Sequence, residues 1–269
     1  MSFLTNSFLY GGAAAAPLDG YASSLVGAWS VARRLLTSYT GKLIRVRRSS
    51  DNTEQDIGYT GTGDLDTTAL LAFCGSGNGF IVTLYDQSGA GNDFAQNSST
   101  VQAQIVSSGT VQAFGTRVGC AHTAPQRMES SVPLTQPTTI TYVGLITQHA
   151  FIMMYDGQDA THRNDFGDWN GQVIMGAGSD KEFLPAFDNS PHISTALFNS
   201  TNSACWIDGS SKFSGDVGTE NAVNGLRLWA AFNYSNNATG IWAEMYAWNR
   251  DLGSAGRSLE AATQSYFGL

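Results

Sequence analysis

The chain has 269 residues, of which 42% are hydrophobic and only 13% are charged, and its formal net charge is −8 at pH 7. A chain of this length buries a substantial core without disulfides or metals. The acidic balance, with no basic run beyond Arg45, Arg47 and Arg48, argues against nucleic-acid binding, and no apolar run is long enough to cross a membrane.

The first 20 residues differ in composition from the rest of the chain. They end in glycines and alanines followed by Pro17, which is typical of a linker. The five large apolar residues before this run predict an assembly arm that docks on other subunits, namely Phe3, Leu4, Phe8, Leu9 and Tyr10. A first strand of the domain is the alternative. Because the first basic residue is Arg33, we expect no signal peptide. We divide the chain into an arm, 1–20, and one domain, 21–269.

Hydrophobic spacing predicts the elements of the first third of the chain. Apolar residues three and four apart favour a helix over 21–38, and alternation favours a strand over 43–48. A short strand over 56–59 and a helix over 64–73 follow, the latter capped by Asp64 or Asp66.

From residue 80 onward, short apolar or alternating runs are separated by glycine, asparagine and aspartate turns. This pattern predicts strands over 80–85, 101–106, 111–118, 138–147, 150–155, 172–176, 182–187, 192–199, 203–208, 225–232 and 239–248. So many short strands indicate a β-sandwich or barrel. The periodicity of 254–267 predicts a closing helix that Gly268 ends.

The three cysteines, Cys74, Cys120 and Cys205, are far apart and form no CxxC pair. Their spacing argues against a zinc site. One disulfide with a leftover thiol and three reduced, buried cysteines both fit the sequence.

The C-terminal strands resemble a known architecture. Trp206-Ile207-Asp208-Gly209 is followed by a strand with Glu244 and then by Asn249-Arg250-Asp251-Leu252. This order is similar to the closing hairpin, strand and helix of concanavalin A-like (laminin G-like) domains. The resemblance implies an all-β fold, a concanavalin A-like jelly-roll sandwich with a few short peripheral helices.

The opening stretch resembles a narrower family. Residues 32–36, 43–51, 73–74 and 84–92 are similar to the catalytic domain of the α-L-arabinofuranosidase B family, whose members are retaining glycosidases on a jelly-roll scaffold. The resemblance extends from about residue 22 to residue 267. The chain also looks like the phage virion proteins that carry this module.

The residues that the resemblance implies for catalysis are only partly present. A retaining glycosidase needs two carboxyls about 5–5.5 Å apart. The acid/base aspartate of the family corresponds to Asn233, whose amide cannot exchange a proton in that role. The adjacent cysteine pair of the family corresponds to 164–168, where no cysteine occurs. If the chain is an enzyme, its carboxyls are expected in the middle strands or on the closing strand, with Asp180, Glu182, Asp188 and Glu244 as candidates.

Other polar and aromatic residues suggest ligand binding, and each has a structural alternative. The candidates for ligand contact are Asp86, Gln87, Trp169, Asn233 and Tyr234. In the structural alternative, Asp86 instead holds a tight loop. The four histidines show no metal spacing, and we expect no cofactor. An acidic loop leaves Ca²⁺ open as an alternative, with Asp156 and Asp165 as its weak candidates beside Asp159 and Asp168.

These observations together predict a protein without catalytic activity, because the acid position carries an amide. We expect a virion structural and binding protein of a phage, such as a capsid or tail decoration or a fibre component, with a lectin-like domain. Its expected partners are other virion proteins, through the arm, and host-surface glycans, and we expect a homo-oligomer. The alternative is a secreted retaining glycoside hydrolase of the α-L-arabinofuranosidase type.

Overall fold

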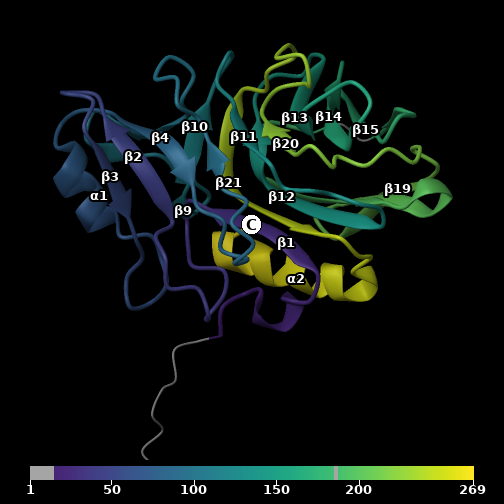
Figure 1. The fold of residues 1–269 in the computed structure, drawn as a ribbon, viewed down its shortest axis with the longest axis horizontal. Helices are drawn as coiled ribbons and strands as arrows, with labels where there is room; N and C mark the ends of the chain where they lie inside the picture. Colours follow the sequence, from purple (N-terminus) through teal and green to yellow (C-terminus); the bar gives the residue numbers. More distant parts are fainter. Residues whose placement is uncertain (1–14, 185–186) are drawn as a thin grey trace, which may run out of the picture.

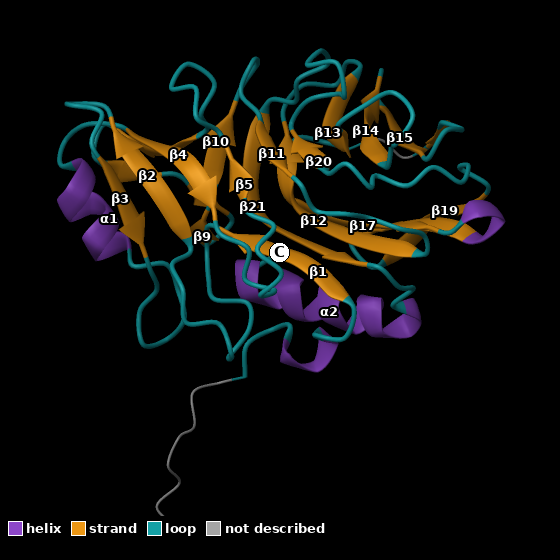
Figure 2. Ribbon diagram, viewed as in Figure 1, coloured by secondary structure: helices purple, strands orange, loops and turns teal. Residues whose placement is uncertain are grey.

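The computed structural model describes residues 15–184 and 187–269. Strands dominate it, and two α-helices, α1 (Thr67–Cys74) and α2 (Gly253–Phe267), lie at its periphery (Figure 2). The prediction of an all-β jelly-roll sandwich is confirmed. The five residues of the predicted arm lie outside the described residues, and the division into arm and domain stays a prediction.

Nineteen strands of the described residues join into one continuous sheet, and β8 and β9 form a separate ribbon. The bounds are β1 (Leu25–Ser30), β2 (Ile44–Arg48), β3 (Glu54–Ile57), β4 (Gly79–Leu84), β5 (Phe94–Ala95), β6 (Gln104–Ser107), β7 (Thr110–Val111), β8 (Ala113–Phe114), β9 (Arg117–Val118), β10 (Cys120–His122), β11 (Met128–Ser130), β12 (Thr138–Ile146), β13 (Ile152–Gly157), β14 (Asp165–Trp169), β15 (Gln172–Gly176), β16 (Lys181–Phe183), β17 (His192–Phe198), β18 (Ser203–Ile207), β19 (Ser210–Gly215), β20 (Leu226–Leu228) and β21 (Gly240–Trp248).

The sheet folds into two layers with the core between them (Figure 1). In one layer, β19, β18, β17, β12 and β21 pair in that order, and β21 pairs with both β1 and β10 on its other side. In the second layer, β16, β15, β14, β13, β20, β11 and β5 pair in order. Strand β4 pairs with β5 and with β6, and thereby connects the layers.

Strand β21 is buried along almost its whole length. Its side chains alternate between two environments, as a strand requires. Met245 and Ala247 belong to the main core, whereas Tyr246 and Trp248 pack with Leu259 of α2. The strand has no exposed face because α2 covers the outer side of its layer.

The predicted helix over 21–38 is wrong. Residues 25–30 form β1, whose register on β21 runs from Leu25 opposite Trp248 to Ser30 opposite Glu244. Trp29 is fully buried against Phe94, with ring centroids 4.6 Å apart. Pairing with a central strand and burial of this tryptophan therefore outweigh a local helical spacing.

Other local predictions are confirmed. Asp66 caps α1 by accepting a hydrogen bond from the Ala69 amide at 2.9 Å. Gly268 ends α2 in the left-handed conformation, at φ 72°. The Asp208-Gly209 turn between β18 and β19 has φ values of 52° and 75°, which suit a two-residue hairpin.

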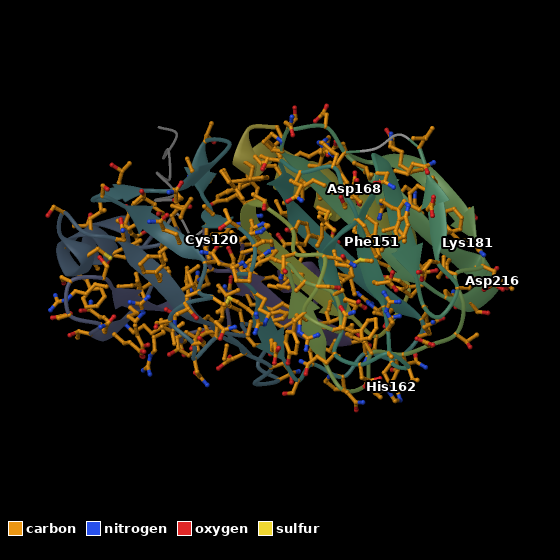
Figure 3. All side chains as sticks on the ribbon, turned by 90° about the horizontal axis from the view of Figure 1, so that it is seen from above. Cys120, Phe151, His162, Asp168, Lys181 and Asp216 are labelled. Carbon is orange, nitrogen blue, oxygen red and sulfur yellow. The ribbon has the colours of Figure 1, made fainter. Side chains whose placement is uncertain are left out.

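All three cysteines are buried and free, so the reduced alternative holds. Cys120 lies in the interior (Figure 3), and burial raises the pKa of its thiol. No helix in the described part of the chain is long and apolar enough to span a membrane.

His122 is fully buried and stacks on Trp229, with ring centroids 4.6 Å apart. Its Nδ1 lies 3.0 Å from the Ala238 carbonyl oxygen, which can only accept, so Nδ1 carries the hydrogen. No partner for Nε2 occurs among the described residues. Burial lowers the pKa of His122 to about 4, so the ring is neutral in the folded protein.

The pH dependence of stability tests this assignment. Between about pH 6.5 and pH 4 the unfolded chain binds a proton at His122 that the folded protein does not. The free energy of unfolding therefore decreases as the pH is lowered through this interval, by roughly 3 kcal/mol in all. The variant His122→Phe should lose this part of the dependence in urea unfolding at pH 7 and pH 4.5. If the wild type and His122→Phe lose the same free energy of unfolding between these two pH values, the assignment of a neutral, buried His122 is wrong.

Candidate functional site

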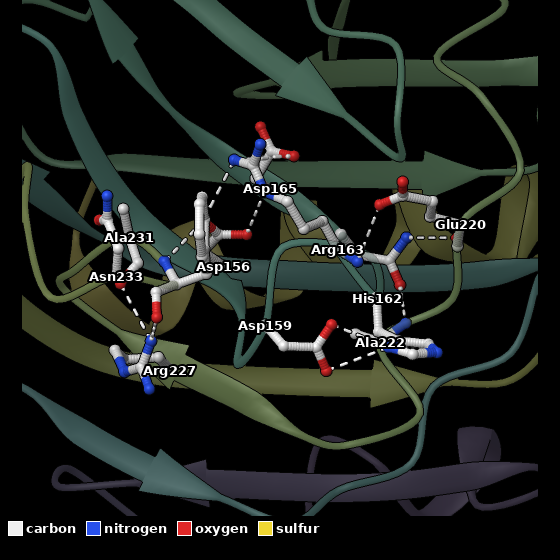
Figure 4. A network of polar contacts seen from close by, with 12 residues as sticks. Asp156, Asp159, His162, Arg163, Asp165, Glu220, Ala222, Arg227, Ala231 and Asn233 are labelled. Atoms are coloured by element: carbon white, nitrogen blue, oxygen red, sulfur yellow. Dashed lines mark hydrogen bonds and ion pairs between the residues drawn. The ribbon is translucent and has the colours of Figure 1, made fainter.

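A charged network lies where β13, β14 and β20 come together (Figure 4). Arg163, in the connection between β13 and β14, is at its centre. Its Nε and Nη2 donate to the two carboxylate oxygens of Asp156, each at 3.1 Å. Its Nη2 also lies 3.4 Å from Asp165 Oδ1. One guanidinium therefore stands between two carboxyls that are both fully buried.

The buried carboxyls are unequally satisfied. Asp156 also accepts the Phe232 amide at 2.9 Å, whereas no hydrogen bond to either oxygen of Asp165 occurs in the described part of the chain. Burial raises the pKa of both side chains, and the Asp156 charge raises the pKa of Asp165 further. Asp165 is thus the carboxyl of the network that favours its protonated form.

A third carboxyl, that of Asp180, lies near the Asp165 carboxyl, and oxygens of both lie beside the Cα of Gly176. A Cβ on Gly176 would lie 2.2 Å from Asp180 Oδ1 and 2.8 Å from Asp165 Oδ1. The two oxygens are therefore no more than 5.0 Å apart, which is the sum of these two distances. Only a glycine leaves room for this approach.

A cavity of about 260 Å³ opens beside the network, lined by Ala160, Arg163, Gly178, Asp180 and Glu220. Asp180 is exposed and Glu220 half-buried. Glu220 Oε2 accepts the Arg163 amide at 3.2 Å. A Cβ on Gly178 would lie 2.9 Å from the Glu220 carboxyl, and the φ of this glycine is 91°. The cavity thus presents two accessible carboxyls, one of them held by a backbone donor, next to a guanidinium.

The loop 231–235 is attached to the same network. Arg227 Nη1 donates to the carbonyls of Ala231, at 3.0 Å, and Phe232, at 2.5 Å. The Asn233 side-chain oxygen accepts the Ser235 amide at 3.1 Å, so it closes a turn. Tyr234 is 49% exposed, and the guanidinium carbon of Arg227 lies 4.0 Å from its ring centroid.

The other predicted ligand residues of the first half hold a loop. Asp86 is buried and accepts the amides of Ala28 at 3.0 Å, Ser88 at 2.8 Å and Asn92 at 3.0 Å. Gln87 is also buried and accepts the Leu35 amide at 2.7 Å. These contacts connect the glycine-rich loop after β4 to strand β1, through Ala28, and to the segment that follows β1, through Leu35.

Trp169 and two aspartates that we expected in a loop lie on or beside β14. Trp169 is half-buried against Phe151, with centroids 3.9 Å apart. Asp165 and Asp168 are strand residues, which corrects the predicted loop. Asp168 is buried and lies 3.3 Å from His149 Nδ1.

The predicted catalytic carboxyls lie apart from one another. Glu182 is exposed on β16. Asp188 is exposed and lies 3.0 Å from His192 Nε2. Glu244 is fully buried with Arg33, Nε to Oε1 at 2.8 Å. Of the carboxyls considered from the sequence, Asp180 is the one that lines the cavity.

Arg163 and Glu220 were not predicted as site residues. Glu220 lies 40 residues after Asp180 in a segment without regular structure, so no periodicity marks it. Arg163 lies inside the acidic stretch that we interpreted as a possible cation site, between Asp159 and Asp165. Among the described residues, no group of three or more His, Cys, Asp or Glu side chains has the arrangement of a metal site. Near Asp156 and Asp165 the guanidinium supplies the positive charge.

The protonation of Asp165 can be tested by stability. Because its pKa is raised in the fold, the folded carboxyl holds a proton that the unfolded chain releases, and this costs stability as the pH rises above about 4. Asp165→Asn should therefore gain stability relative to the wild type between pH 4 and pH 8, by about 1.4 kcal/mol for each unit by which the fold raises the pKa of Asp165. Thermal melts at both values measure the difference. Asp168→Asn, on the same strand, is the control for replacing a buried carboxyl of β14 by an amide; Asp168 accepts the Gly171 amide at 2.9 Å. An unchanged difference for Asp165→Asn would refute protonation.

Comparison with known proteins shows where the similarity lies. The family model "Alpha-L-arabinofuranosidase B, catalytic" matches residues 17–131. Alpha-L-arabinofuranosidase B of Emericella nidulans is 41% identical over 87 residues, which are 31% of this chain and 17% of that protein. The alpha-L-arabinofuranosidase of Hypocrea jecorina is 40% identical over 86 residues, again 31% and 17%. The family model therefore ends before the charged network begins.

Solved structures extend the similarity of fold. A GH54 α-L-arabinofuranosidase soaked with a cyclic sulfate inhibitor has a TM-score of 0.73 and 18% identity. An arabinofuranosidase complexed with arabinofuranosyl-α-1,2-xylobiose has a TM-score of 0.72 and 18% identity. Each alignment covers 91% of this chain and 64% of the solved chain, so this chain spans less than two thirds of its structural neighbours.

These findings correct the predicted function. A non-catalytic phage virion protein, and a location in the virion, are wrong, because the matched relatives and the neighbours in fold are arabinofuranosidases. The prediction rested on the amide at Asn233, on the missing cysteine pair at 164–168 and on the apolar arm, whereas the structure gathers other carboxyls around a cavity. Over residues 17–131 the chain is similar to the catalytic domain of α-L-arabinofuranosidase B, and over 91% of its length it shares the fold of such enzymes.

Proposed function

We propose that this chain is a retaining glycoside hydrolase that acts on α-L-arabinofuranosides. The observation that carries the proposal is the cavity in which Asp180 and Glu220 flank Arg163. A retaining glycosidase needs at least two carboxyl groups that reach the substrate, one as nucleophile and one as general acid/base, and this cavity presents two. We take the sugar, α-L-arabinofuranose, from the names of the relatives, and the jelly-roll scaffold from the fold shared with solved arabinofuranosidases.

The contacts of the two carboxyls support different roles. Glu220 is held by the Arg163 amide, so it is the better positioned nucleophile. Its carboxylate would attack the anomeric carbon while the glycosidic C–O bond breaks, and Asp180, at the exposed side, would give its proton to the leaving oxygen. Asp180 would then take a proton from water, which releases the sugar from Glu220 with retained configuration.

The buried aspartates would support this chemistry without touching the sugar. Asp156 holds the Arg163 guanidinium by two hydrogen bonds, and this fixes the cationic wall of the cavity. Asp165, when protonated, adds no negative charge next to Asp180.

The natural substrate, the location of the protein and its assembly are also open to proposal. We propose arabinose side groups of polysaccharides as the substrate, since one neighbour in fold was solved with arabinofuranosyl-α-1,2-xylobiose. Asn233 and Tyr234, attached to the network through Phe232, would contact the sugar beyond the scissile bond. A secreted protein, an assembly arm at 1–20 and a homo-oligomer are also proposals.

Release of 4-nitrophenol from 4-nitrophenyl α-L-arabinofuranoside tests the activity. Asp180→Ala and Glu220→Ala should each lower kcat/KM by about 100-fold or more, because each removes a reacting group. Glu182→Gln is the control: its carboxyl is exposed on β16 and should not matter. Azide should give a retained glycosyl azide with Asp180→Ala and an inverted one with Glu220→Ala. An inactive wild type, or full activity in both alanine variants, would refute the proposal.

A further inference from the structure

The segment that follows β20 is strained in its backbone. Trp229, Tyr234 and Asn236 have φ values of 64°, 65° and 52°, all in the left-handed region. Asparagine tolerates this region, whereas for a bulky aromatic residue such an angle is an outlier. Residues strained in this way persist only where their surroundings hold them, and they cluster at functional sites. The contacts that hold this segment therefore indicate what it does.

Arg227, on β20, holds the loop 231–235 from inside the protein (Figure 4). Its side chain is buried, and its Nη1 donates to the carbonyls of Ala231 at 3.0 Å and Phe232 at 2.5 Å. Its Nε donates to Glu129 Oε1 at 3.1 Å, and this carboxylate neutralises the buried charge. Its guanidinium carbon lies 4.0 Å from the Tyr234 ring centroid. One side chain therefore fixes the loop at three of its residues.

Phe232 connects this loop to the charged network in two ways. Its amide donates to Asp156 Oδ2 at 2.9 Å. Its ring lies against the Arg163 guanidinium, whose carbon is 5.1 Å from the ring centroid. Asp156 holds the same guanidinium by its two hydrogen bonds. Both contacts depend on the position of the Phe232 peptide, which Arg227 fixes through the carbonyl oxygen.

We propose that Arg227 is a positioning residue of the cavity that Arg163 lines. It lies outside the cavity lining and acts through the Phe232 peptide, which keeps Asp156 and thereby the Arg163 guanidinium in place. A guanidinium that is already in position stabilises charge in the transition state, whereas one that must first be ordered does so at a cost in rate. This effect on rate rests on the proposed hydrolysis, but the effect on the Phe232 peptide does not.

Hydrogen exchange of the full chain, followed residue by residue by NMR, tests the structural part without any activity. The Phe232 amide should exchange about tenfold faster or more in Arg227→Lys than in the wild type, because lysine lacks the planar fork that holds two carbonyls. Arg45→Lys is the matched control, since Arg45 is partly exposed and paired with Asp56 at 2.7 Å. Unchanged exchange at Phe232 in Arg227→Lys, or exchange that is equally faster throughout the sheet, would overturn the proposal.

Kinetics with 4-nitrophenyl α-L-arabinofuranoside test the catalytic part. Arg227→Lys should lower kcat by about tenfold with little change in KM, because a misplaced guanidinium weakens transition-state stabilisation and leaves ground-state binding intact. Arg45→Lys should leave kcat unchanged. Asp156→Ala should lower kcat too, and adding Arg227→Lys to it should cost less than about twofold more, since both changes act on one guanidinium.

The outcomes separate the two proposals. A full tenfold further loss in the double variant would show that Arg227 acts independently of Asp156 and would overturn its positioning role. A wild type without activity would refute the hydrolysis, while faster exchange confined to the loop in Arg227→Lys would still support the hold of Arg227 on Phe232. The exchange measurement needs no Asp156 variant, so the proposal stays testable if Asp156→Ala does not fold.

Discussion

The fold depends on one buried ion pair at its centre. Glu244 lies on β21, the strand that is covered on both faces, and a lone carboxylate there would be strongly destabilising. Arg33 supplies two hydrogen bonds, at 2.8 and 3.1 Å, and Ser30 and Tyr246 add hydroxyl donors. The Arg33 guanidinium also lies 3.7 Å from the ring centroid of Tyr266 on α2. A single carboxylate thereby joins β1, β21 and the last helix.

This arrangement separates the scaffold from the chemistry. The region that matches the family model, residues 17–131, contains Arg33 and the Asp86 loop, and their contacts serve the sandwich. The network around Arg163 lies later in the chain, on strands of the second layer. Family resemblance in the first part therefore identifies the fold, and the proposed activity rests on the carboxyls of the cavity, because a fold by itself does not fix a function.

The sequence predicted those elements of the fold that depend on interactions between residues close together in the chain. Most strands, α2 and the Asp208-Gly209 hairpin follow from periodicity and turn chemistry, which operate over a few residues. Strand β1 was missed because its pairing with β21 joins residues more than 200 positions apart. The site was only partly predictable for the same reason. Asp180 stands out as a carboxyl of the middle strands, whereas its proximity to Glu220 and Arg163 exists only after folding.

Covalent labelling tests the central claim that Asp180 and Glu220 form a glycosidase site. One neighbour in fold was solved with a cyclic sulfate inhibitor, and such a reagent reacts with a glycosidase nucleophile. Incubation with an arabinofuranose-configured cyclic sulfate, followed by peptide mass spectrometry, should place a single adduct on Glu220 in the wild type and none in Glu220→Ala. No adduct, or one on an exposed carboxyl such as Glu182, would contradict the account.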